Sequence, residues 1–134
     1  MIKTYQVEKD NYQDAGKASS DIKRTLKALG IDRKILKAVA IACYEAEINI
    51  AIHSDGGTVT FEIDDDGIVH LAFGDIGPGI EDLNLAQTPG YSTASPKARE
   101  LGFGAGMGLY NMKSVASTFE ITSSNEGTHI KMTF

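Results

Sequence analysis

Hydrophobic residues recur every three to four positions through the first part of the chain, which is the spacing of one side of a helix. A strand over 2–7 comes first, and two helices follow it. Gly30 suits the position just after the first helix, and Asp32 suits the N-cap of the second, which we expect to end near Ser54. The apolar stripes are Tyr12, Ala15, Ile22, Leu26 and Leu29 in the first helix, and Leu36, Val39, Ala40, Cys43, Ala46 and Ile50 in the second.

After the second helix, apolar and polar residues alternate, which predicts strands with one buried face. Residues 58–63 form the first of these strands, and Asp66-Gly67 predicts a hairpin turn. The returning strand, 68–73, is apolar at more of its positions, so we expect it nearer the centre of the sheet. A helix over 107–118, a strand from Phe119, a turn at 125–127 and a strand to Phe134 complete the chain.

Residues 74–108 show neither period and are rich in glycine and proline. An irregular segment of this length is unusual inside a small domain and is typical of a lid or a binding loop. We therefore look for function in this segment and in the elements that flank it.

The order of these elements favours an α+β fold. Strands joined mostly as hairpins, with helices grouped in sequence, predict a two-layer α/β sandwich: helices on one face of a mixed, mostly antiparallel sheet. The 134 residues fit a single domain, 1–134.

Composition narrows the classes of function. Thirteen basic and 18 acidic residues give a net charge of −5, which argues against electrostatic binding of nucleic acid. Cys43 is the single cysteine, which excludes an internal disulfide and a multi-cysteine zinc site. The longest apolar run, 38–44, is far shorter than the roughly 20 residues of a membrane span, and no secretory signal is visible. We expect a cytoplasmic protein that binds neither nucleic acid nor membrane.

Glu45 and Asn49 are the first candidates for chemistry, because they lie four residues apart on one face of the second helix. On a semi-buried stripe both side chains need partners, and Mg²⁺, water and a phosphate would satisfy them. The pair could equally arise by chance or as a local hydrogen bond. Glu47 lies about 200° around the helix from Glu45 and is a weaker candidate. We expect His53 to pack at or cap the helix end rather than touch a phosphate.

Two glycine-rich boxes lie at the ends of the irregular segment. Asp75-Ile76-Gly77-Pro78-Gly79 follows a strand, where an aspartate can accept a hydrogen bond from an exocyclic amine and glycines let a flat ligand approach. In the second box, Gly104, Gly106 and Gly108 precede Leu109 and a helix, where backbone amides can hold phosphate. A tight turn and a merely flexible loop are the alternatives. The second box is neither a P-loop nor a dinucleotide fingerprint.

Taken in order, E-x-x-x-N, D-x-G-x-G, G-x-G-x-G-L and a late Gly127-Thr128 resemble the ATP-binding domain of the GHKL superfamily. This superfamily includes gyrase, the Hsp90 chaperone, histidine kinases and the mismatch-repair MutL protein, and its architecture is called the Bergerat fold. The resemblance covers nearly the whole chain, from the first helix to Phe134.

The resemblance implies a role for each box, with ATP and Mg²⁺ as cofactors. Glu45 would be the general base that takes the proton from a serine hydroxyl, and Asn49 would coordinate Mg²⁺. Asp75 would bind the adenine amine, assisted by Thr128. The remaining cofactor-binding positions are Gly77 and Gly79, which leaves space for the ring, together with the phosphate-binding Gly104, Gly106 and Gly108 and the adjoining Leu109.

The subfamily can be narrowed from chain length and histidine positions. A gyrase- or chaperone-type protein needs further domains, for which 134 residues leave no room, and no histidine precedes Asn49 to act as the phosphoacceptor of a histidine kinase. The chain looks most like the small anti-sigma factor serine kinases of bacterial stress and sporulation switches.

That likeness implies a protein-serine kinase acting on a STAS-type, anti-anti-sigma partner. A sigma factor, a phosphatase and a second copy of this chain in a homodimer are further expected partners. Two alternatives remain: a nucleotide-dependent binding module that regulates a partner without kinase activity, and a structural or small-ligand domain whose glycines are only turns. An intact Glu45 favours the kinase, since a pure binder needs no base.

Overall fold

Five strands form one sheet in the order β1-β2-β3-β5-β4 in the computed structural model, which describes residues 1–80, 82–89 and 107–134. Each neighbouring pair of these strands is antiparallel. The sheet formed by the described residues is therefore wholly antiparallel, whereas the sequence predicts a mixed, mostly antiparallel one. The elements are β1 (Ile2–Val7), α1 (Lys17–Ala28), α2 (Arg33–His53), β2 (Gly57–Ile63), β3 (Val69–Asp75), α3 (Leu83–Ala86), α5 (Gly108–Val115), β4 (Thr118–Ser124) and β5 (Gly127–Thr133).

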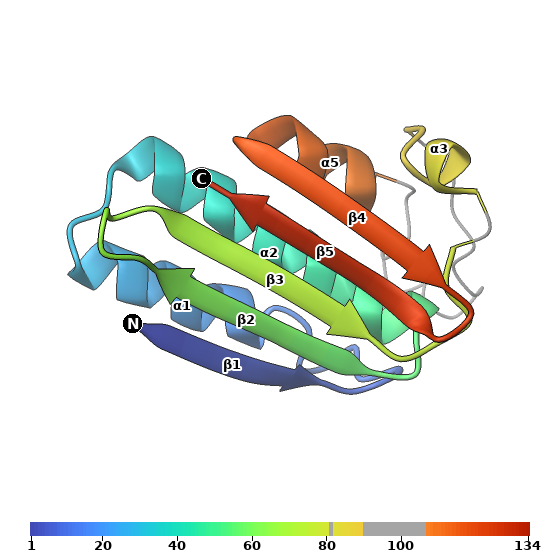
Figure 1. Cartoon of the computed structure of the whole chain (residues 1–134). Coiled ribbons are helices and arrows are strands. Elements are labelled where there is room, and N and C mark those ends of the chain that lie inside the picture. Colours follow the sequence, from blue (N-terminus) through green and yellow to red (C-terminus); the bar gives the residue numbers. More distant parts are fainter. Residues whose placement is uncertain (81, 90–106) are drawn as a thin grey trace.

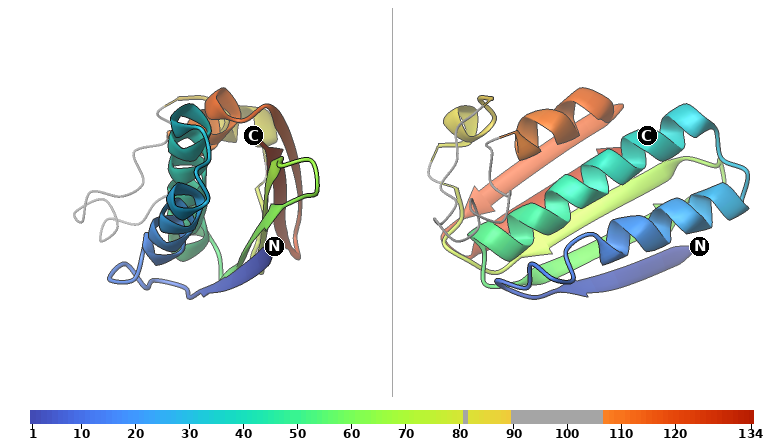
Figure 2. Two further views of the ribbon diagram at one scale, coloured as in Figure 1. Left: turned by 90° about the vertical axis from the view of Figure 1, so that its left-hand side faces the viewer. Right: turned by 180° about the vertical axis from the view of Figure 1, so that it is seen from behind.

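The helices α1, α2 and α5 cover one face of the sheet (Figures 1 and 2). Their apolar stripes meet the inward side chains of the strands, which confirms the predicted α+β sandwich and the central position of β3. The most deeply buried side chains come from both layers: Ile22, Leu26, Val39, Cys43, Val59, Phe61, Val69, Leu71, Met112 and Met132.

Most strand boundaries agree with the sequence prediction to within one residue, and larger differences occur at α1, β3 and α5. Tyr12 and Ala15 precede α1 rather than belonging to it, because residues 10–16 form turns closed by bonds such as Asn11 Oδ1 with the Asp14 amide. The strand β3 continues two residues beyond Phe73, so Asp75 is its last residue. The helix α5 spans 108–115 rather than 107–118 and ends where Ala116 becomes extended.

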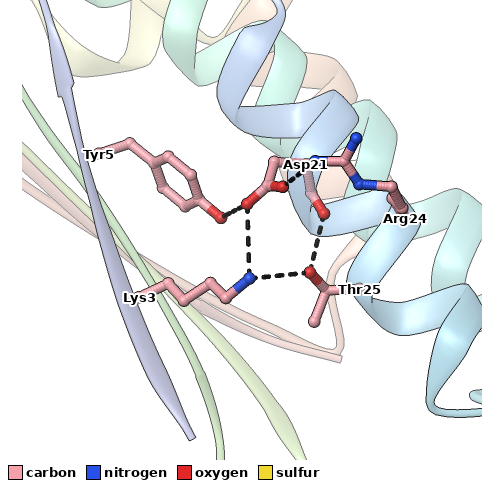
Figure 3. A network of polar contacts seen from close by, with 5 residues as sticks. All are labelled: Lys3, Tyr5, Asp21, Arg24 and Thr25. Carbon is pink, nitrogen blue, oxygen red and sulfur yellow. Dashed lines mark hydrogen bonds and ion pairs between the residues drawn. The ribbon is translucent and has the colours of Figure 1, made fainter.

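A polar network fixes the edge strand β1 to α1 (Figure 3). Asp21 on α1 accepts a hydrogen bond from the Tyr5 hydroxyl at 2.5 Å and pairs with Arg24 and, at 3.6 Å, with Lys3. Lys3 also donates to Thr25 Oγ1 at 3.2 Å. This network therefore joins the β1 edge of the sheet to the helical layer.

The elements that carry the sequence boxes reach the same end of the sheet, on the right in Figure 1. There β3 ends at Asp75, β4 ends at Ser124 and β5 begins. The connection after α2 is joined to the segment after β3, because the Asp55 amide donates to the Ile76 carbonyl at 2.6 Å and the Ile76 amide donates to the Gly56 carbonyl at 2.9 Å. None of the helices in the described part of the chain has the length and hydropathy needed to cross a membrane.

Candidate functional site

Glu45 and Asn49 share one half-buried face of α2, directed toward the N-terminal turn of α5. Glu45 Oε1 accepts a hydrogen bond from Asn111 Nδ2 at 3.2 Å. Asn49 lies against Gly108, where a β-carbon would be only 2.9 Å from Asn49 Oδ1. A larger residue at 108 would therefore push the Asn49 amide out of place, and the pair that the spacing predicted does occupy one face.

The N-terminus of α5 differs from those of the two longer helices. Asp32 caps α2 by accepting from the Lys34 amide at 2.7 Å, and Glu47 accepts from the first amides of α1. At α5 no side chain of the described residues caps the first turn. Uncapped amides at the positive end of a helix favour an anion, and these lie next to Asn49.

Asp75 forms the second part of the site, at the end of β3. Its Oδ1 accepts from the Thr128 amide at 2.9 Å, and its Oδ2 has no hydrogen bond within the described residues. Partial burial raises the pKa of the Asp75 carboxyl above its usual value, while the Thr128 bond and nearby His129 act to lower it. One oxygen is thus fixed by the sheet and the other is left as an acceptor.

Thr128 and Ser123 continue the polar row across β5 and β4. They are cross-strand partners whose hydroxyl oxygens lie 2.8 Å apart, and Thr128 is buried. Ser123 Oγ also accepts from the Ile80 amide at 2.7 Å. The segment after β3 is therefore held against the far edge of the sheet, directly beside the Asp75–Thr128 pair.

A glycine is needed at position 79 because of its backbone conformation and its close approach to β4. Its φ of +76° is unfavourable for other residues, and a β-carbon would overlap the carbonyl oxygen of Ser124. Gly77 is buried, with Ser54 Cα 3.2 Å from its β-carbon position. Both glycines allow the box to pack against its neighbours, and their role toward a bound ring stays a prediction.

The structure places the other predicted positions less directly. The Leu109 side chain is part of the hydrophobic core, so contact with a cofactor would involve its backbone. His53 ends α2, and burial lowers its pKa. Gly104 and Gly106 lie outside the described residues, as do the other residues of 90–106 and residue 81, all within the irregular segment 74–108 for which the sequence predicts a lid or binding loop.

Two contributors to the site, Asn111 and Ser123, were missed in the sequence, and Glu47, named there as the weaker candidate for chemistry, has a structural role that was missed. Glu47 is 2% exposed and caps α1, and the signal was its position on the buried stripe, four residues after Cys43. Asn111 was detectable as a polar residue three positions after Gly108, on the same helix face. Ser123 gave no local signal, because its partners come from other parts of the chain.

These groups can hold a nucleotide and a divalent cation. Carboxylate and amide oxygens are ligands that Mg²⁺ accepts, and the amides of α5 suit phosphate. The free oxygen of Asp75 suits an amine of a base. Among the described residues no group of three or more His, Cys, Asp or Glu side chains is arranged to bind a metal.

Comparison with known structures shows the same fold at low sequence identity. The RsbU and RsbW domains of Rv1364c from Mycobacterium tuberculosis match with a TM-score of 0.62 and 17% identity, over 98% of this chain and 32% of that one. The SiaB-SiaC complex from Pseudomonas aeruginosa matches with a TM-score of 0.63 and 11% identity, over 98% and 88% of the two chains. A blue-light activated histidine kinase domain from Erythrobacter litoralis EL346 gives 0.53 and 12%, over 90% and 64%.

Comparison of sequences gives the family. No curated protein matches the sequence. The family model described as "Histidine kinase-like ATPase domain" matches residues 9–134, nearly the whole chain, in agreement with the GHKL resemblance of its boxes. ATP is the ligand that this membership implies. The chain is a member of the histidine kinase-like ATPase domain family.

Proposed function

We propose that this domain is an ATP- and Mg²⁺-dependent anti-sigma regulatory kinase that phosphorylates a serine of a STAS-domain partner. The observation that carries the proposal is the half-buried Glu45, held by Asn111 next to Asn49 at the N-terminus of α5, which no described side chain caps. A domain that only bound nucleotide would have no use for a carboxylate in this place.

Each residue has one task in the reaction. Asn49 would hold Mg²⁺, which would neutralise charge on the phosphates, and the amides around Gly108 would hold the phosphates. Glu45 accepts the proton of the serine hydroxyl while the serine oxygen bonds to the γ-phosphorus and the bond to the β–γ bridging oxygen breaks, which releases ADP. Positioning and charge neutralisation supply most of the catalysis in phosphoryl transfer.

A protein partner is supported by the similar structures, since one is a complex of SiaB with SiaC and another contains RsbU and RsbW domains in one chain. The present chain spans 32% of the Rv1364c chain, so activities of that whole protein carry over only as proposals. We propose a STAS-domain protein as phosphoacceptor, a sigma factor or a phosphatase as the regulated partner, a homodimer as the assembly and the cytoplasm as the location.

The Glu45→Gln variant tests the kinase role. We expect ATP affinity within a few-fold of wild type and a rate of γ-phosphoryl transfer lower by on the order of 10²–10⁴, the usual contribution of a positioned base. The partner is recovered by pull-down with and without MgATP, and transfer is followed with labelled ATP beside a nucleotide titration. Glu120→Gln, an exposed site on β4, is the matched control.

The outcomes separate the alternatives. If wild-type protein binds ATP and its partner but never transfers phosphate, the binding-module function replaces the kinase. If Glu45→Gln transfers phosphate at the wild-type rate, the base is another residue. Glu47→Gln is a poor control, because Glu47 is a buried helix cap whose loss would disturb the fold.

The Asn49→Ala variant tests the metal role. Its lost contact is to the cation rather than to the base, so ATP affinity should fall about tenfold or more in Mg²⁺ and stay within about twofold in EDTA. Calorimetric titration of the same protein in both conditions measures the two values. Equal losses with and without Mg²⁺ would remove Asn49 from this role.

A further inference from the structure

Ser123 on β4 is a half-buried polar residue that belongs to none of the sequence boxes and has no role in the proposed mechanism. Its hydroxyl joins the segment after β3 to the strand β5. The Ile80 amide donates to Ser123 Oγ at 2.7 Å, and Ser123 Oγ lies 2.8 Å from Thr128 Oγ1. Thr128 in turn donates its backbone amide to Asp75 Oδ1 at 2.9 Å. Ser123 therefore closes a chain of hydrogen bonds that begins at Asp75 and returns to the same loop at Ile80.

The hydroxyls of Ser123 and Thr128 are close enough to share a hydrogen bond, and either oxygen could be its donor. Each hydroxyl has one hydrogen to donate and can also accept. The Ile80 amide already donates to Ser123 Oγ, and a hydroxyl that accepts a hydrogen bond becomes a better donor. This favours the arrangement in which the Ser123 hydrogen is directed to Thr128 Oγ1, which leaves the hydrogen of the Thr128 hydroxyl for another acceptor.

We propose that Ser123 is a positioning residue for base specificity: it holds the Thr128 hydroxyl as a hydrogen-bond donor beside the acceptor Oδ2 of Asp75. This inference rests on the proposed function, because it concerns the base of the bound ATP. A neighbouring donor and acceptor match adenine, whose 6-amino group donates and whose N1 accepts. They oppose hypoxanthine, whose O6 accepts and whose N1–H donates.

Three triphosphates separate the Thr128 contact from the Asp75 contact. ATP offers both the amine and an accepting N1, purine riboside triphosphate keeps N1 but lacks the amine, and ITP reverses both groups. In the Ser123→Ala variant the Thr128 hydroxyl is free to rotate and can accept as well as donate. We expect affinity for ATP and for purine riboside triphosphate to fall by the same factor, about tenfold, while affinity for ITP stays within about twofold of wild type.

The variants are chosen to distinguish positioning from a general effect on the fold. Ser123→Thr keeps the hydroxyl and should restore the wild-type preference for ATP over ITP. Ser124→Ala is the matched control, since the exposed Ser124 hydroxyl forms one hydrogen bond within the described residues, accepted from the Glu126 amide at 3.2 Å. In a Thr128→Val background, Ser123→Ala should not change the ATP-to-ITP ratio further, because the hydroxyl through which it acts is gone.

All affinities are measured with the full chain in Mg²⁺ by direct titration, so no partner or turnover is required. An equal loss for all three nucleotides in Ser123→Ala would make Ser123 a loop anchor and overturn the inference, as would an unchanged ATP-to-ITP ratio. If the wild-type protein binds none of the three, the proposed function fails as well. If it binds ATP and the ratio does not move, only the role of Ser123 fails.

Discussion

Two glutamates on α2 show how differently one residue type behaves two positions apart. Glu45 is half-buried and receives one hydrogen bond, from Asn111. Glu47 is 2% exposed, and its two oxygens accept from the backbone amides of Gly16, Ala18 and Ser19 at 2.6–3.2 Å. Glu47 thus offsets the cost of its burial by binding the positive end of α1, whereas Glu45 keeps lone pairs that no other hydrogen bond within the described residues uses.

The first prediction at this scale concerns stability. Glu47→Gln places an NH₂ group among backbone donors and removes the charge at the helix end, so we expect the free energy of unfolding to fall by about 2–3 kcal/mol. Urea unfolding at neutral pH measures it. Glu45→Gln, on the opposite face of the same helix, should change stability by less than about 0.5 kcal/mol. Similar losses in both variants would contradict the division of roles.

The sequence was sufficient to put Glu45 and Asn49 on one face, because helical spacing alone decides which side chains are neighbours. It placed Glu47 elsewhere on α2 but could not name its partners, since the amides of Gly16 and Ser19 come from a segment 28–31 residues away. Contacts across such distances depend on how the layers pack, and periodicity carries no information about them.

At the scale of elements, the termini of strands and helices decide where the site lies. The hairpin turn and the apolar run predicted the returning strand over 68–73, but the pairing of β3 with β2 extends to Asp75, which the pattern does not show. The extra residues put the Asp75 carboxylate in line with Thr128 on the neighbouring strand. The start of α1 was likewise displaced, because Glu47 caps the amides at Gly16 and beyond rather than those near Tyr12.

The link between β1 and α1 gives a pH-dependent prediction. The Tyr5 hydroxyl, and after it Arg24, lowers the pKa of Asp21 below its usual value. A lowered folded-state pKa stabilises the fold above the unfolded value of about 4, and this contribution is lost as the pH falls through the folded pKa. Tyr5→Phe should therefore be less stable than wild type at pH 7, and the difference should shrink below about pH 4.

Urea unfolding of both proteins between pH 7 and pH 3 measures this difference. Tyr110→Phe serves as the control, because Tyr110 is exposed on α5 and its hydroxyl has no hydrogen bond within the described residues. Its stability should follow wild type at every pH. A constant gap between Tyr5→Phe and wild type across the range would show that the Tyr5 bond does not depend on the charge of Asp21.

At the scale of the whole molecule, the candidate site joins segments that are distant in sequence. Glu45 and Asn49 come from α2, Asp75 from β3, Gly108 from α5 and Thr128 from β5. Their order along the chain resembled a known family, and the family match over residues 9–134 agrees with it. Physical reasoning from periodicity predicted the two layers, but the strand order, with β5 between β3 and β4, needed the structure.

This arrangement predicts where a bound nucleotide slows hydrogen exchange. Openings that require release of ATP become rarer by a factor of 1 + [ATP]/Kd, about 100-fold at a hundred times Kd, whereas openings elsewhere keep their rate.

With MgATP we expect strong protection at 75–80, at 107–112 and at 126–129. We also expect protection across 79–104, the part of the irregular segment 74–108 for which the sequence predicts a lid. The strand β1 and the helix α1, which the Asp21 network joins at the β1 edge of the sheet, should exchange as before. Hydrogen–deuterium exchange followed by mass spectrometry, with Asp75→Asn at the same ATP concentration as a control for site occupancy, measures all of these segments in one experiment. Unchanged exchange at 107–112 under saturating MgATP would contradict phosphate binding at α5, and protection confined to β1 and α1 would move the nucleotide site to the opposite half of the domain.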